Sequence, residues 1–236
     1  MKFRSLIVLL LALSPLLLTA CQTTITEEVT IHSTDHSTDY DYTPLYNHSY
    51  SLASVHGLAQ GEWMHFPLHG SDSYGHDWSG YITRQGLPGE WVNGTWTIPT
   101  MTEISLVHAA SGGTLRRTAT LYLDQYGHEV KKVLGNGVVC YPTTVNDIPS
   151  FALDGDYGNL ASMNCSDGSE QVGIWDLFSN PDHSADFITL EESYTGIINT
   201  DYIEITQTLN TDGLILGYSI NLFDPHYGVT IWLYSN

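Results

Sequence analysis

Residues 90–98 read EWVNGTWTI, two short runs of strand-forming residues joined by Asn93-Gly94. Trp, Val, Thr and Ile suit a pleated, half-buried surface. Asn-Gly readily takes the positive φ angles of a type I′ turn. The stretch therefore predicts a tight β-hairpin with strands at 90–92 and 95–98.

A second, longer hairpin is predicted directly after the first, with strands at 103–110 and 114–124 joined across Gly112-Gly113. Bulky and polar residues alternate over 118–124, as in a strand with one buried face. No stretch shows a convincing apolar stripe of helical period over three turns. Further strands are predicted at 77–83, 129–134, 171–178, 186–191, 202–209, 214–221 and 229–234.

Closely spaced short strands separated by turn residues indicate an all-β fold, either an antiparallel β-sandwich or a β-barrel. We expect this globular region to span residues 48–236. A change in charge together with Pro142 and Pro149 leaves open a subdivision near 135–150 into two small β modules.

Residues 1–20 have the pattern of an export signal. Lys2 and Arg4 precede a mostly apolar run of thirteen residues, 6–18. A helix that spans a bilayer needs about 20 apolar residues, so a cleaved leader is the better interpretation. Leu18-Thr19-Ala20-Cys21 follows this run and resembles the lipobox of bacterial lipoproteins.

The lipobox resemblance implies a location in the cell envelope. It implies that Cys21 carries a lipid after the leader is removed, and that this lipid anchors the protein to a membrane. Gln22, in place of an aspartate after the cysteine, favours the outer membrane. Residues 21–47 are poor in aliphatic residues and are expected to form a flexible tether. Within them, His32-Ser-Thr-Asp35 is repeated as His36-Ser-Thr-Asp39, for which a solvated spacer is preferred over metal capture.

Cys140 and Cys165 are the remaining two cysteines. In an oxidising compartment an even pair is most simply a disulfide. We therefore expect these two residues to be joined.

The chain is strongly acidic, with 26 Asp and Glu, seven Lys and Arg, and a formal net charge of −19. No lysine or arginine follows Lys132. A polyanionic surface repels nucleic acid, so a nucleic-acid partner is not expected. Divalent cations and basic protein surfaces remain candidate partners, although solubility alone also explains the charge.

Potential metal ligands are densest between Trp63 and Trp78. Imidazole and carboxylate groups of this kind can bind zinc or copper if a loop folds them together. Exposed loop histidines are the simpler interpretation, so no cofactor is expected unless a divalent cation binds here. The candidate ligands are His65, His69, Asp72, His76 and Asp77.

Fifteen Tyr and six Trp, many beside polar residues, suit a surface that binds glycan or protein by stacking and hydrogen bonding. No common catalytic motif occurs, so the sequence favours a non-catalytic binding or structural role. A hydrolase acting on glycan or peptide is one alternative. Four Gly-x-Trp triplets, at 61–63, 89–91, 94–96 and 173–175, leave a lipocalin-like carrier of a small apolar ligand as another.

Overall fold

The computed structural model describes residues 48–146, 148–225 and 228–235. Nearly all of its regular structure is β-strand, which confirms the all-β fold. The elements, in chain order, are β1 (Ser49–Ser51), α1 (Ala53–His56), β2 (Trp63–Asp72), β3 (Asp77–Gly86), β4 (Glu90–Val92), β5 (Thr95–His108), β6 (Thr114–Leu123), β7 (Glu129–Leu134), β8 (Val139–Pro142), β9 (Phe151–Leu153), β10 (Tyr157–Asn159), β11 (Met163–Cys165), β12 (Glu170–Ser179), β13 (Ala185–Thr195), β14 (Ile198–Leu209), β15 (Ile215–Asp224) and β16 (Val229–Tyr234).

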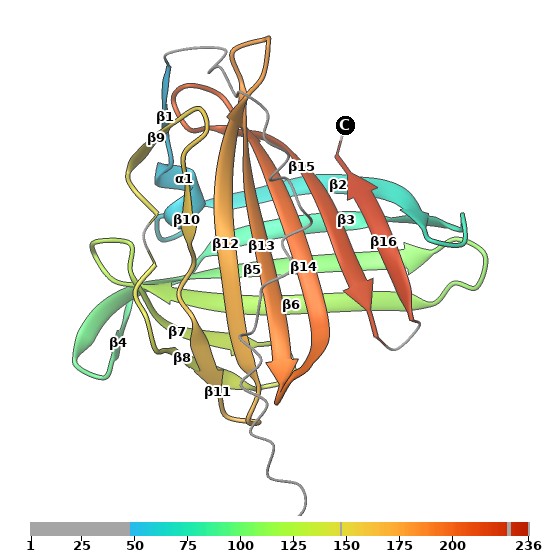
Figure 1. Cartoon of the computed structure of the whole chain (residues 1–236), viewed down its shortest axis with the longest axis horizontal. Coiled ribbons are helices and arrows are strands. Elements are labelled where there is room, and N and C mark those ends of the chain that lie inside the picture. Colours follow the sequence, from blue (N-terminus) through green and yellow to red (C-terminus); the bar gives the residue numbers. More distant parts are fainter. Residues whose placement is uncertain (1–47, 147, 226–227, 236) are drawn as a thin grey trace, which may run out of the picture. The chain divides into compact units, whose positions relative to one another are not determined.

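Twelve antiparallel strands close into a barrel (Figure 1). The order around the ring is β12, β11, β8, β7, β6, β5, β3, β2, β16, β15, β14 and β13, and β13 pairs with β12 to close it. Strands from both sides of residues 135–150 belong to this ring, so both halves of the described chain are needed for closure.

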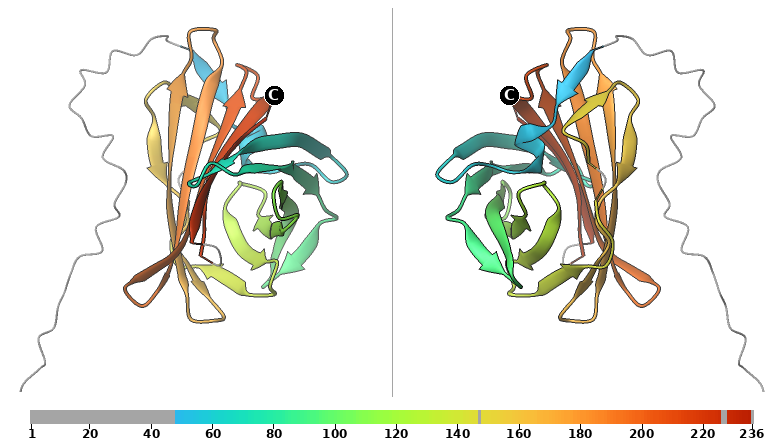
Figure 2. Two further views of the ribbon diagram at one scale, coloured as in Figure 1. Left: turned by 90° about the vertical axis from the view of Figure 1, so that its right-hand side faces the viewer. Right: turned by 90° about the vertical axis from the view of Figure 1, so that its left-hand side faces the viewer.

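The barrel has two layers whose strands run in different directions. Strands β12 to β16, orange to red, run along the vertical in Figure 1, and β2 to β6, cyan to green, cross them. Figure 2 shows the C-terminal strands as one long wall and the N-terminal strands curled opposite it. Fully buried side chains fill the space between the layers, among them Leu106 from one layer and Leu177, Phe187 and Leu222 from the other.

Both predicted hairpins are present. Asn93 and Gly94 have φ angles of 49° and 84°, as a type I′ turn requires. β5 takes part in both hairpins, because it pairs with β4 at its start and with β6 along most of its length. The predicted strands 129–134 and 229–234 coincide with β7 and β16.

β2 was not predicted as a strand, because Pro67 and Gly70 interrupt its pattern. β2 pairs with β3 over nine residues, but with β16 only from His69 to Asp72. Pro67 therefore lies where the strand has one neighbour, the position in which a sheet tolerates proline. The short strands β1, β8, β9, β10 and β11 were also missed.

Candidate functional site

A groove of about 460 Å³ lies on the outer surface where β16, β2 and β3 run side by side. Two aromatic rings, Trp232 and Tyr234, border it with His69, and three serines supply hydroxyl groups. Its volume falls within the range of about 300–1,000 Å³ that is usual for small-molecule sites. The complete lining is His69, Gly70, Ser71, Asp77, Trp78, Ser79, Ala109, Ser219, Trp232, Leu233 and Tyr234.

Strand alternation puts the polar and aromatic side chains that border the groove on the outer face, whereas Trp78 and Leu233 are buried beneath it. Residues two apart share a face of a strand, so His69 and Ser71 of β2 point outward together. In the sheet, Tyr234 lies opposite His69, and Trp232 lies opposite Ser71. In each pair the side chain on β16 is larger than the one on β2. We attribute the groove to this difference in size.

Gly70 keeps β2 and β16 close together beneath the groove. A Cβ atom at this position would overlap the backbone carbonyl of Trp232. The absence of a side chain is therefore a steric requirement of the pairing between the two strands.

Aromatic rings extend from this groove along β2. The His69 and Tyr234 rings meet edge to face with centroids 4.1 Å apart. Farther along the strand, His65 lies between Trp63 and Tyr81, with centroid separations of 5.5 and 5.2 Å.

The structure places the five predicted metal ligands in different surroundings. His65 and His69 belong to the outward aromatic row, whereas Asp72 is buried at the end of the same strand. The exposed side chain of Asp77 lines the groove. Among the described residues, the group able to hold a metal ion consists of Asp72, His76 and His108, whose candidate ligand atoms all lie within 4.8 Å of one another.

Asp72 organises the turn between β2 and β3. Its Oδ1 accepts hydrogen bonds from the backbone N–H groups of Tyr74 (2.9 Å) and His76 (3.0 Å). Its Oδ2 accepts one from Trp78 Nε1 (3.1 Å) and lies 3.2 Å from His76 Nδ1. Burial alone would raise the pKa of Asp72, but these hydrogen bonds outweigh it and lower the pKa to about 2. The carboxylate is therefore negatively charged at neutral pH.

The same turn occurs a second time between β6 and β7. Residues 72–76 read DSYGH and residues 124–128 read DQYGH. Asp124 Oδ1 accepts bonds from Tyr126 N–H and His128 N–H, and its Oδ2 lies 3.3 Å from His128 Nδ1. Glycine is needed at the fourth position of both turns, because Gly75 and Gly127 have φ angles of 80° and 84°. The Asp–His contact is thus a property of the turn.

His108 distinguishes the first turn from the second. It lies opposite Trp78 in the register of β3 and β5, and its ring centroid is 5.1 Å from that of His76. Sequence reasoning missed His108 because it stands 32 residues after His76 and only the strand pairing brings it close. The repeated Asp-x-Tyr-Gly-His pattern could have predicted from the sequence that the two turns share one conformation.

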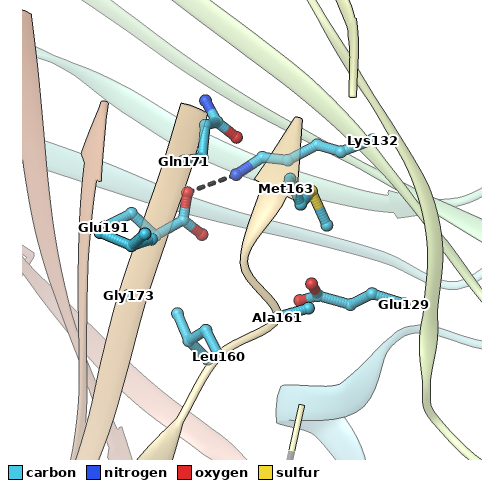
Figure 3. A pocket seen from close by; sticks show the side chains of 9 residues that line it. Glu129, Lys132, Leu160, Ala161, Met163, Gln171, Gly173 and Glu191 are labelled. Atoms are coloured by element: carbon cyan, nitrogen blue, oxygen red, sulfur yellow. Dashed lines mark hydrogen bonds and ion pairs between the residues drawn. The ribbon is translucent and has the colours of Figure 1, made fainter. Parts of the chain in front are cut away.

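Inside the barrel, three ionisable side chains border a cavity of about 10 Å³, room for about one water molecule (Figure 3). Lys132 forms an ion pair with Glu191, and Glu129 lies across the cavity. Burial raises the pKa of Glu129 to about 7; the charge of Lys132 opposes this rise and that of Glu191 adds to it. Burial alone would lower the pKa of Lys132, but Glu191 and Glu129 together raise it.

The predicted disulfide between Cys140 and Cys165 is confirmed. The two residues face each other on β8 and β11, and their Cα atoms are 3.9 Å apart. The predicted leader, the lipid attachment residue Cys21 and the segment up to residue 47 lie outside the described residues.

In the described part of the chain, no helix has the length and apolar character required to cross a bilayer. No protein-family model, no curated protein and no solved structure matches the chain. What the protein does must therefore be inferred from its own residues.

Proposed function

We propose that this protein is a lipid-anchored protein of the cell envelope that binds a glycan without catalysing a reaction on it. The observation that carries this proposal is the outward groove bordered by Trp232, Tyr234 and His69. Sugar rings have an apolar face and a rim of hydroxyl groups. A groove that offers aromatic rings beside polar side chains matches both features.

The polar side chains of the groove indicate which sugars it suits. Ser71, Ser79 and Ser219 can each donate and accept a hydrogen bond. Asp77 supplies a carboxylate, and no lysine or arginine lines the groove. Neutral and amino sugars should therefore bind better than acidic ones.

The hydrolase alternative would need an acid–base pair facing a cleft that can hold substrate. The contact of Asp72 with His76 recurs at Asp124 and His128, so it is explained by the turn. Glu129 has a raised pKa, but the cavity beside it has room for about one water molecule. These observations favour binding over catalysis.

The carrier alternative would need a ligand-sized space inside the barrel. Large side chains occupy the interior, including Phe187, Leu177 and Ile220, each less than 2% exposed. The outer groove is a better candidate for a ligand than this packed interior.

The proposed location rests on the lipobox at residues 18–21. A lipid on Cys21 would anchor the protein, and the outer membrane is favoured by Gln22. The residues from 22 to 47 would then separate the barrel from the membrane.

A glycan array probed with the chain from Gln22 onward, which lacks the proposed lipid attachment residue, tests the proposed function. We expect binding to a set of neutral or amino sugars. Trp232→Ala should weaken it at least about tenfold, because loss of a central Trp contact typically costs about 2 kcal/mol or more, and about 1.4 kcal/mol already corresponds to a factor of ten. Trp91→Ala is the matched control, since Trp91 is also an exposed Trp but lies on β4, outside the groove. Absence of glycan binding, or equal loss in both variants, would overturn the proposal.

A further inference from the structure

We propose that Asp72, His76 and His108 form a binding site for a divalent transition metal ion, with Zn²⁺ as the preferred metal. The site lies where the turn after β2 meets the end of β5. The argument for this metal site does not rest on the proposed glycan binding.

The donor set is the first argument. Two imidazoles and one carboxylate match three-ligand zinc sites in proteins, in which solvent takes the remaining position. Imidazole nitrogens favour zinc and copper over calcium and magnesium, which prefer oxygen ligands.

The spacing of the donor atoms is the second argument. One atom of each side chain lies within 4.8 Å of the others. Ligand atoms about 2.0–2.2 Å from a tetrahedral zinc ion lie roughly 3.3–3.6 Å from each other. Closing the site therefore requires a movement of roughly 1 Å. The His76 side chain is 50% exposed, so one side of its ring faces solvent and can move toward the other two ligands.

The surroundings hold the other two groups in place. The Asp72 carboxylate is buried and fixed by the hydrogen bond from Trp78 Nε1. His108 Nδ1 lies 2.6 Å from Ser111 Oγ and accepts a hydrogen bond from the backbone N–H of Ser111 (3.2 Å). These contacts fix the orientation of the ring. Metal binding through Nε2 would require Nδ1–H to donate to Ser111 Oγ instead, as is usual around metal-bound histidines.

The second turn provides an internal comparison. Asp124 and His128 repeat the contacts of Asp72 and His76, yet the described residues place no third ligand beside them within the same distance. The turn alone accounts for the Asp–His pair but not for His108. The added imidazole is what converts one of two equal turns into a candidate metal site.

Calorimetric titration of metal-stripped protein with ZnCl₂ tests the site. The mature chain should carry His32→Ala and His36→Ala, so that the repeat at 32–39 contributes no imidazole ligands. We expect one Zn²⁺ per chain. His76→Ala and His108→Ala should each weaken binding by more than the 10–100-fold that is typical of changes next to a metal ligand. His128→Ala, at the equivalent position of the other turn, should bind as the parent does.

Electron paramagnetic resonance of the Cu²⁺-loaded protein distinguishes ligation from an indirect effect on folding. We expect coupling to two imidazole nitrogens in the parent and to one in His108→Ala. Lack of stoichiometric Zn²⁺ binding, or His76→Ala and His108→Ala behaving as His128→Ala does, would overturn the proposal.

Discussion

Trp232 of β16 lies directly opposite Ser71 of β2 on the outer surface of the barrel. The pairing of the largest side chain with one of the smallest opens the groove between the strands. A larger residue at position 71 should therefore fill the site from within.

Ser71→Tyr should reduce glycan binding at least about tenfold. The free energy of unfolding should change by no more than about 0.5 kcal/mol, as is usual for surface substitutions. Ser105→Tyr is the control, because Ser105 lies on β5 and does not line the groove. Dissociation constants and urea melts of both variants check this expectation. Unimpaired binding by Ser71→Tyr would place the ligand elsewhere.

Glu129 should make the protein less stable as the pH rises. Its pKa is about 7 in the folded protein and near 4.5 when unfolded, so the folded state binds the proton more tightly. Stability linked to this group is greatest below pH 4.5 and is lost as the pH rises to about 7. Glu129→Gln should therefore stabilise the protein more at pH 8 than at pH 4.5.

The size of the Glu129 effect is bounded by the pKa shift. At about 1.4 kcal/mol per pKa unit, the gain is at most roughly 3.5 kcal/mol, and partial solvent access reduces it. Glu191→Gln provides the contrast. It removes the partner of the buried Lys132 and should destabilise the protein at both pH values. Urea unfolding at pH 4.5 and pH 8 measures both changes, and a Glu129→Gln gain that does not grow with pH would contradict the assignment.

The disulfide should contribute strongly to stability. It closes a loop of 25 residues, for which the chain-entropy model gives roughly 3–4 kcal/mol. The double variant Cys140→Ala/Cys165→Ala should therefore unfold at clearly lower urea concentration than the oxidised parent. Reduced parent protein is the control and should match the double variant. Equal midpoints for all three would show that packing alone holds the segment between β8 and β11.

Cys21→Ser should abolish lipid attachment, because the lipid would be joined to the sulfur atom of the Cys21 thiol. Metabolic labelling with a palmitate analogue should mark the parent only, and the variant should keep its leader. Labelled, normally processed Cys21→Ser protein would contradict the proposed anchor.

The hairpins were predictable because their signals are local. Asn93-Gly94 and the alternation over 118–124 depend on residues close together in the chain, and the structure has both hairpins. β2 was not predicted because Pro67 is unfavourable in a strand that has two neighbours. Only the three-dimensional structure shows that β16 pairs with β2 from His69 to Asp72 and does not reach Pro67.

The groove and the candidate metal site could not be predicted in the same way, because both form through pairings between segments far apart in the sequence. The groove requires β16 to meet β2 across more than 150 residues, and His108 reaches His76 only through the register of β3 and β5. Local signals, spacing and composition predicted aromatic recognition and included Asp72 and His76 among the candidate metal ligands. These signals could not show that His65 and His69 lie apart from Asp72 and His76, because the alternation of side chains along β2 decides which face each residue occupies.

The most direct test of glycan binding in the groove is a nuclear magnetic resonance titration that follows the indole N–H signals of the six tryptophans. The titrant is the strongest ligand from the glycan array. Binding in the groove predicts a saturable shift of the Trp232 signal and unchanged signals from Trp91 and Trp96, which lie on β4 and β5. Saturable shifts of Trp91 or Trp96 with an unchanged Trp232 signal would contradict it.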